Sequence, residues 1–396
     1  MVSPSYDIIT VGGGIAASAL ARAMAGRGAK VLILERETQF KDRVRGEGVV
    51  PWGVAEADEL GIRGLLREKC AHEVPQVEGG TGLRDLTTTT PQHLPLLSFQ
   101  HHVMQETLLA AAESAGAEVR RGISVGHVEH GAHPTVVVDG NGHERISARL
   151  VVAADGRGSP VRKWTDFAVC EQSNGYYMAG VLLTDIPAPA DIFYAVFNPE
   201  LGTWSGLIPQ GGGRFRAYFV YPKTIGYRLQ GDSMLGAFIR ESARAYAPLG
   251  DLFAHAKSIG PLASFDASDW WVEHPYRDGV ALVGDAAATT DPTFGQGLSF
   301  AMRAARVLRD ELTNNSDWDA AGHRYAEQHQ RSFRACHTVE GWYRALFQDP
   351  SPEAISLRAK AMPLIAADPT RVPDHILSGP DLPLSEQVRA RFFGEC

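Results

Sequence analysis

The N-terminal part of the chain carries the pattern of a strand, a helix and a second strand. Residues 6–11 form a short apolar run rich in β-branched side chains, residues 16–27 place Ala, Leu and Met at helical spacing, and residues 31–34 form a second apolar run. Glycines separate the three segments, so we predict strand, helix and strand in that order. Two later apolar runs, residues 150–154 and 280–283, predict further buried strands.

Between residues 176 and 221 the pattern changes to short, aromatic-rich runs separated by turn residues. The predicted strands of this region are residues 176–185, 192–197, 203–209 and 214–221. In the last run every second residue from Phe215 to Tyr221 is apolar, and the positions between them are mixed. Such alternation predicts one apolar and one mixed face, so we interpret the region as an inserted antiparallel sheet.

After residue 331 the sequence predicts a helix over residues 336–347 and then a proline-rich, extended end between residues 363 and 383. We interpret this part as a C-terminal helical wrap, not as an independent domain.

Composition and charge exclude several classes of protein. Hydrophobic residues make up 44% and charged residues 21% of the 396 positions, which is typical of a globular protein. The net charge of −8 provides no overall positive field for nucleic acid. The scattered Cys70, Cys170, Cys336 and Cys396 form no C-x-x-C pair, so neither a disulfide framework nor a metal site is expected. With no signal peptide and no long apolar stretch in the sequence, we expect a cytoplasmic protein without a membrane span.

The turn between the first strand and helix predicts a dinucleotide site. It reads Gly12-Gly13-Gly14-Ile15-Ala16-Ala17, a G-x-G-x-x-A pattern. Gly12 allows the tight turn, Gly14 lets the backbone approach a pyrophosphate at the helix N-terminus, and Ala17 allows close contact between helix and strand. Glu35 ends the second strand, where a carboxylate can accept hydrogen bonds from a ribose.

Two more motifs follow predicted strands. One strand ends in Asp155-Gly156 and another in Gly284-Asp285, and each motif places a carboxylate beyond a strand's carboxyl end, where open α/β sheets bind ligands. The second motif continues into a loop, Pro292-Thr293-Phe294-Gly295-Gln296-Gly297-Leu298, and then into a predicted helix.

Together these motifs resemble the single-component (group A) FAD-dependent aromatic hydroxylases, whose type member is para-hydroxybenzoate hydroxylase. The basic turn Arg43-Val44-Arg45-Gly46 and Gln105, which opens a predicted helix over residues 106–115, add to the resemblance. It covers most of residues 6–310. The resemblance implies an α/β fold, in which a Rossmann-like FAD-binding domain carries an inserted antiparallel β-sheet substrate domain and a C-terminal helical segment.

The resemblance also implies a division into domains. The FAD-binding domain would comprise residues 1–70, 98–166 and 277–330, the substrate domain residues 71–97 and 167–276, and the C-terminal wrap residues 331–396.

The implied cofactor is FAD. The residues implied to bind it are Gly12, Gly14, Ala17, Glu35, Arg36, Arg45, Gln105, Asp155, Asp285, Pro292, Gly295, Gly297 and Leu298. Asp155 would serve FAD and the nicotinamide donor, or is an ordinary turn carboxylate. Pro292, Gly295 and Gly297 would form the loop that faces the flavin ring, and the helix N-terminus near Gly297 would stabilise negative charge on the reduced ring.

The implied activity is that of a monooxygenase that uses NAD(P)H and O2 to hydroxylate a small aromatic or polycyclic substrate through a flavin C4a-hydroperoxide. NAD(P)H is expected only as a transient electron donor, because no second G-x-G-x-x-G follows a strand. Candidate substrate contacts are Tyr176, Tyr194, Trp204 and Tyr218. We assign no catalytic base, since His101 and His102 are at least as well explained as loop residues. A monomer or a homodimer is expected.

Three alternatives remain at this point. Trp204-Ser205-Gly206-Leu207-Ile208-Pro209 and Gly46-Glu47 partly match flavin-dependent halogenases. That match lacks the second Trp of a W-x-W-x-I-P motif, and Lys69 is the only lysine between residues 51 and 91. Geranylgeranyl-reductase-type flavoenzymes would share the scaffold. A non-catalytic nucleotide sensor would not need the flavin-ring loop.

Overall fold

A computed structural model describes residues 5–44, 46–79, 82–139 and 144–395. Its first sheet has a parallel centre, in the order β20-β21-β11-β1-β2-β8. These strands are β1 (Tyr6–Val11), β2 (Val31–Glu35), β8 (Glu118–Arg121), β11 (Arg145–Ala153), β20 (Tyr276–Arg277) and β21 (Val280–Leu282), and β9 (Val125–Glu129) and β10 (Thr135–Val138) extend the sheet beside β11. The side chains of β1, β2 and the end of β11 are mostly apolar and are buried on both faces of the sheet, which is typical of parallel strands.

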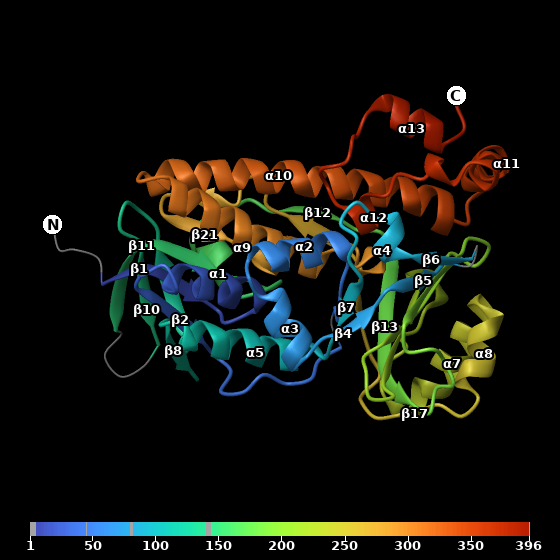
Figure 1. Cartoon of the computed structure of the whole chain (residues 1–396), viewed down its shortest axis with the longest axis horizontal. Coiled ribbons are helices and arrows are strands. Elements are labelled where there is room, and N and C mark those ends of the chain that lie inside the picture. Colours follow the sequence, from blue (N-terminus) through green and yellow to red (C-terminus); the bar gives the residue numbers. More distant parts are fainter. Residues whose placement is uncertain (1–4, 45, 80–81, 140–143, 396) are drawn as a thin grey trace.

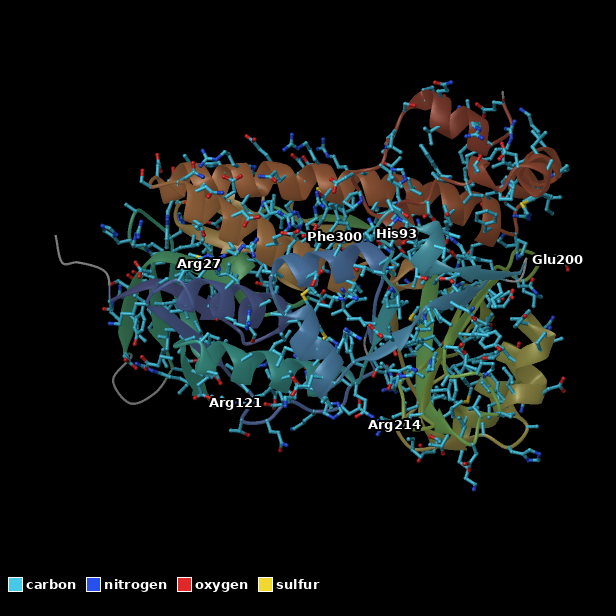
Figure 2. The ribbon with its side chains drawn as sticks, in the orientation of Figure 1. Arg27, His93, Arg121, Glu200, Arg214 and Phe300 are labelled. Atoms are coloured by element: carbon cyan, nitrogen blue, oxygen red, sulfur yellow. The ribbon has the colours of Figure 1, made fainter. Side chains whose placement is uncertain are left out.

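Helices cover this sheet. They are α1 (Ile15–Ala25), α2 (Pro51–Glu59), α3 (Arg63–Lys69), α5 (His101–Ser114), α6 (Pro160–Trp164), α9 (Gly297–Asn314) and α10 (Trp318–Tyr343). Helix α1 packs against α5 and α9, and α10 lies along α9 (Figure 1). Phe300 of α9 lies in the interior, with its ring 5.4 Å from that of Trp52 and 6.1 Å from that of Phe333 (Figure 2).

The second sheet is mostly antiparallel, in the order β17-β13-β16-β15-β14-β5-β6, with β18 beside β13. Its strands are β5 (Gln76–Glu78), β6 (Leu83–Asp85), β13 (Tyr176–Thr184), β14 (Ile192–Asn198), β15 (Thr203–Pro209), β16 (Phe215–Pro222), β17 (Lys257–Ser258) and β18 (Ala263–Asp266). The apolar face predicted for residues 215–221 packs against α7 (Leu235–Ala245) and α8 (Ala247–Phe253). The mixed face, with Tyr218 and Val220, lies on the other side.

Two three-stranded sheets connect these parts. One contains β3 (Gly48–Val49), β7 (Leu96–Ser98) and β4 (His72–Val74), and the other β12 (Cys170–Gln172), β19 (Asp269–Trp271) and β22 (Ala288–Thr289). The short helix α4 (Leu86–Thr89) follows β6.

The C-terminal part differs from its prediction. The expected helix over residues 336–347 is the end of α10, which starts at Trp318, crosses the predicted border at residue 331 without a break and ends in a π-helical turn, Arg344–Gln348. The expected extended end contains α11 (Pro352–Ala367), which accommodates Pro363, as well as α12 (His375–Ser378) and α13 (Glu386–Phe392). Packing around Phe392 and Phe393 overrides the helix-breaking tendency of proline there.

A second correction concerns α5. It begins at His101, four residues before Gln105, so His101 and His102 occupy its first turn and do not lie in a loop. The rest of the prediction is confirmed: an α/β fold carries an antiparallel second sheet and a helical C-terminal segment.

Candidate functional site

One cavity of about 2090 Å³ is lined by the glycine turn, both carboxylate motifs, the loop at residues 292–298 and the mixed face of the second sheet. A pocket for one ligand of drug size usually measures about 300–1,000 Å³. The cavity therefore has room for a large cofactor and a substrate together.

The glycine turn has the geometry that its sequence predicts. Gly12 has φ +96°, and a Cβ there would lie 2.5 Å from the carbonyl oxygen of Ala154. Gly14 precedes α1, lines the cavity, and no side chain caps the helix at that position. Ala17 is fully buried and does not line the cavity, as expected of a residue that lets helix and strand approach. The open N-terminus of α1 suits a pyrophosphate.

Glu35 lines the cavity beside this turn. Its Oε2 accepts a hydrogen bond from the Gly13 N–H at 2.7 Å, and its Oε1 accepts one from the Glu37 N–H at 2.8 Å. Each carboxylate oxygen can accept a second hydrogen bond, so Glu35 can still receive ribose hydroxyls. Arg36 lines the cavity next to it and is largely exposed.

Asp155 lines the cavity with an orphaned oxygen. Its Oδ2 accepts from the Val161 N–H at 3.1 Å, whereas its Oδ1 is buried without a hydrogen-bond partner. Burial raises the pKa of this carboxyl above its ordinary value. A buried acceptor without a donor is costly, and a ligand hydroxyl would satisfy it.

Arg162, which follows Asp155, has a structural position. It is buried, its guanidinium lies 3.9 Å from the ring centroid of Trp270, and it donates to the carbonyl oxygens of Ala286 and Arg157 at 3.1 and 2.9 Å. It thus ties the Asp155 motif to the Asp285 motif. It does not line the cavity.

The loop after Asp285 presents backbone to the cavity. Asp285, Pro292, Gly295, Gly297 and Leu298 all line it. Gly295 has φ +65°, and a Cβ on Gly295 or Gly297 would meet nothing within 4 Å, so both glycines border open space. Helix α9 starts at Gly297 without a side-chain cap. These features and those at α1 and Asp155 fit FAD.

The buried carboxylate of Asp291 fixes this loop on the side away from the cavity. Asp291 Oδ1 accepts from the Thr293 N–H at 2.9 Å, and Oδ2 accepts from Asn174 Nδ2 at 2.8 Å and Arg344 Nη2 at 2.9 Å. Asp291 is completely buried, which raises its pKa. The sequence motif contains Asp291, but its partner Arg344 is 53 residues away and could not be recognised.

Of the remaining predicted cofactor residues, Gln105 lines the cavity from the second turn of α5. Arg43 of the basic turn, which was not among the predicted cofactor residues, also lines the cavity and donates to Glu37 Oε1 at 2.8 Å. Arg45 lies outside the described residues.

The four aromatic candidates do not lie together. Trp204 and Tyr218 line the cavity. Tyr194 packs with the opposite face of the sheet, beside α7 and α8, and Tyr176 is buried in the core without lining the cavity. Alternation along each strand separates the two faces, but it did not show which face turns toward the cavity.

A buried acid network was missed from the sequence. Arg216 Nη2 donates to Glu47 Oε1 at 2.8 Å, and Tyr218 donates from its hydroxyl to Glu47 Oε2 at 3.0 Å. Glu47 is 1% and Arg216 0% exposed, and burial raises the pKa values of Glu47 and Tyr218. Glu47 and Tyr218 line the cavity. The one available signal was the position of Arg216 on the mixed face of its strand.

The C-terminal segment was also missed as part of the site. The cavity-lining residues that it supplies include Tyr343, Phe347, Arg358, Met362, Ile365, Asp374, His375 and Leu382. Within the parts of the chain that the structure describes, no group of His, Cys, Asp and Glu could hold a metal ion. No helix there has the length and apolar character needed to cross a membrane.

Comparisons with known proteins show the family of this chain. The model of one protein family, the FAD binding domain, matches residues 5–331. Rifampicin monooxygenase of Streptomyces venezuelae is 28% identical over 88% of this chain and 74% of its own length. A chlorinase of Pseudomonas fluorescens, which acts on 1H-pyrrole-2-carbonyl-[peptidyl-carrier protein], is 23% identical over 87% of this chain and 83% of its own length.

The fold likewise matches solved structures. p-Nitrophenol 4-monooxygenase from Pseudomonas putida superimposes with a TM-score of 0.77 at 20% identity, covering 95% of this chain and 97% of that one. At this identity the likeness concerns the fold alone. The chain therefore belongs to the family of the FAD binding domain, and its predicted relationship to the FAD-dependent aromatic hydroxylases and monooxygenases is confirmed.

Proposed function

We propose that this FAD-dependent monooxygenase uses NAD(P)H and O2 to hydroxylate an aromatic or polycyclic substrate. The observation that carries the proposal is the continuity of one cavity, which joins the dinucleotide turn and the loop at residues 292–298 to the face of the second sheet that bears Trp204 and Tyr218. The similarity to rifampicin monooxygenase, whose name indicates oxygenation of rifampicin, supports it.

FAD would be held by residues from several elements. Gly14 and the N-terminus of α1 would bind the pyrophosphate, Glu35 a ribose, and Asp285 the ribityl side. The loop at residues 292–298 and the open N-terminus of α9 would lie against the ring. Bound FAD supplies electron transfer and the activation of dioxygen.

The protein's own residues would position and shield the reactants. The partial positive charge at the N-terminus of α9 would stabilise negative charge on the ring. Trp204 and the neighbouring aromatic side chains would exclude water from the substrate. Glu47 accepts a hydrogen bond from the Tyr218 hydroxyl and pairs with Arg216. The orientation of these polar side chains at the cavity would therefore be fixed before a substrate binds.

Other predictions accompany this proposal. NAD(P)H would act as a transient donor, the FAD-binding and substrate domains would divide as the sequence suggests, and the protein would act in the cytoplasm as a monomer or homodimer.

The test is turnover by the purified protein in air. We expect a flavin spectrum, oxidation of NADH or NADPH that phenols or polycyclic aromatics accelerate, and a product heavier by one oxygen atom. Substrate-independent oxidation that yields only peroxide, with every compound of the panel recovered unchanged, would contradict the proposal.

A flavin-dependent halogenase is the second candidate, favoured by the chlorinase relative and by Trp204 in the cavity. Two observations oppose it. The second Trp of the halogenase motif is replaced by Gly206, where a Cβ would lie 2.3 Å from the Trp204 ring, so any side chain there would require that ring to move. Lys69 pairs with Glu68 at 2.6 Å on α3 and does not line the cavity. A chlorinated product formed with an added flavin reductase would establish the halogenase instead.

A further inference from the structure

The cavity has an aromatic end that lies between the loop at residues 292–298 and the C-terminal segment. The Phe294 ring centroid lies 6.1 Å from those of Phe197 and Tyr343, and the Phe347 centroid lies 6.1 Å from that of Phe197. All four rings line the cavity. Such a group of rings suits a flat, apolar ring system.

The C-terminal wall of this end lies beyond residues 5–331, the part that matches the FAD-binding family. It is formed by the π-helical turn at residues 344–348, by α11 and by α12. The turn contacts α11 and β14, whereas α12 contacts α10 and α2 and lies beside α4 (Figure 1). A wall outside the cofactor-binding part is free to serve the substrate.

Most of the charge on this wall is neutralised. Arg84 pairs with both carboxylate oxygens of Asp374, at 2.7 and 2.8 Å. Burial lowers the pKa of His375, which favours its neutral form.

Arg358 of α11 differs from these residues. Its Nη1 donates to the backbone carbonyl oxygens of Asp349 at 2.6 Å and Leu346 at 3.3 Å, which anchors the guanidinium beside Phe347. Within the described residues, no carboxylate lies within salt-bridge distance of Arg358, and Nη1 is the only one of its nitrogens with a hydrogen bond to protein. Nη2 and Nε therefore keep their donors for a ligand in the cavity that Arg358 lines.

We propose that Arg358 is a substrate-binding residue that pairs with an oxyanion, such as a carboxylate, carried by the aromatic substrate. This inference rests on the proposed function, because it assumes that the aromatic end of the cavity holds the substrate. A guanidinium anchored through one nitrogen can bind a carboxylate through the others without first losing its orientational freedom. The aromatic rings would then hold the ring system of the same molecule.

The test compares an acid with its neutral analogue. Oxidised holoenzyme without NAD(P)H is titrated with 3-hydroxy-2-naphthoic acid and with its amide, and dissociation constants are measured from the flavin absorbance and by calorimetry. We expect the wild type to bind the acid at least about tenfold more tightly, as a charge-assisted hydrogen bond predicts. Arg358→Gln should abolish this preference, and Arg358→Lys should keep part of it.

Arg331→Gln is the matched control, since it removes one positive charge from an exposed site on α10 outside the cavity. It should leave the preference unchanged. FAD content and Tm report whether each variant is folded.

The inference is overturned if the wild type binds acid and amide equally well, whatever the variants do, or if folded Arg358→Gln keeps the full preference. Binding is measured without turnover, so its outcome is separate from that of the proposed function. An enzyme that oxygenates neutral phenols without preferring acids would keep the proposed function and remove the role of Arg358.

Discussion

Several single residues at the cavity cannot be replaced without loss of stability or binding, and Gly12 is the clearest case. Its φ is positive, and a Cβ at this position would lie 2.5 Å from the Ala154 carbonyl oxygen, so there is no room for a side chain. We expect Gly12→Ala to destabilise the protein by about 2–4 kcal/mol and to abolish FAD retention. Gly28→Ala is the control, since Gly28 has φ +88° but no atom within 4 Å of its Cβ position. Urea unfolding measures the stability of both variants. Equal losses of stability would refute the role of the close approach between position 12 and the Ala154 carbonyl oxygen.

Asp155 makes a pH-dependent contribution at the same scale. Its pKa is raised in the folded protein by burial, so ionisation disfavours the native apoprotein, and stability is lost as pH rises through the folded pKa. Asp155→Asn should therefore raise the Tm of the apoprotein near pH 8 and have little effect near pH 4. The same variant should bind FAD more weakly if the orphaned Oδ1 receives the cofactor. A Tm difference that is constant with pH would argue against this assignment.

Asp285→Ala tests the cofactor site directly. Asp285 lines the cavity in the turn after β21, and we expect its loss to leave the purified protein with little or no flavin. Flavin released by denaturation is quantified against protein. A variant with full flavin content would remove Asp285 from the cofactor site.

At the scale of elements, the C-terminal end of α10 supports the loop at residues 292–298. Arg344, in the π-helical turn, and Asn174 hold Asp291, which in turn caps the loop. Asp291→Ala would leave Arg344 without its closest carboxylate, and we expect a loss of about 3–5 kcal/mol. Asp317→Ala removes an exposed helix cap from the same helix and should cost only about 1 kcal/mol. Similar costs for the two, measured by denaturant unfolding, would mean that the buried pair does not hold the loop.

Elements were predicted well where local pattern decides them. β1 and β15 have the predicted bounds, and the glycine turn lies where G-x-G-x-x-A places it. Distant pairings had no local signal: Glu47 meets Arg216 across 169 positions. The start of α10 was not predicted. The first half of this helix, from Trp318, is rich in polar residues and packs along α9, and a contact between two helices cannot be recognised from the local sequence pattern.

At the scale of the whole molecule, the site exists only because three parts of the chain meet. The parallel sheet supplies the end of the cavity that the glycine turn and both carboxylate motifs line, the second sheet supplies Trp204 and Tyr218, and the C-terminal segment closes the aromatic end. The sequence motifs predicted the strands and turns of the first part. Strand alternation predicted the two faces of the second sheet but not which face lines the cavity, and no motif was recognised in the third part.

The most direct test of the proposed monooxygenase is turnover under isotopically labelled dioxygen, with the product analysed by mass spectrometry. We expect one labelled oxygen atom in an aromatic product, formed only when FAD, NAD(P)H and substrate are all present. An oxygenated product whose oxygen comes from water, or a product that gains halogen in place of oxygen, would contradict the proposed reaction.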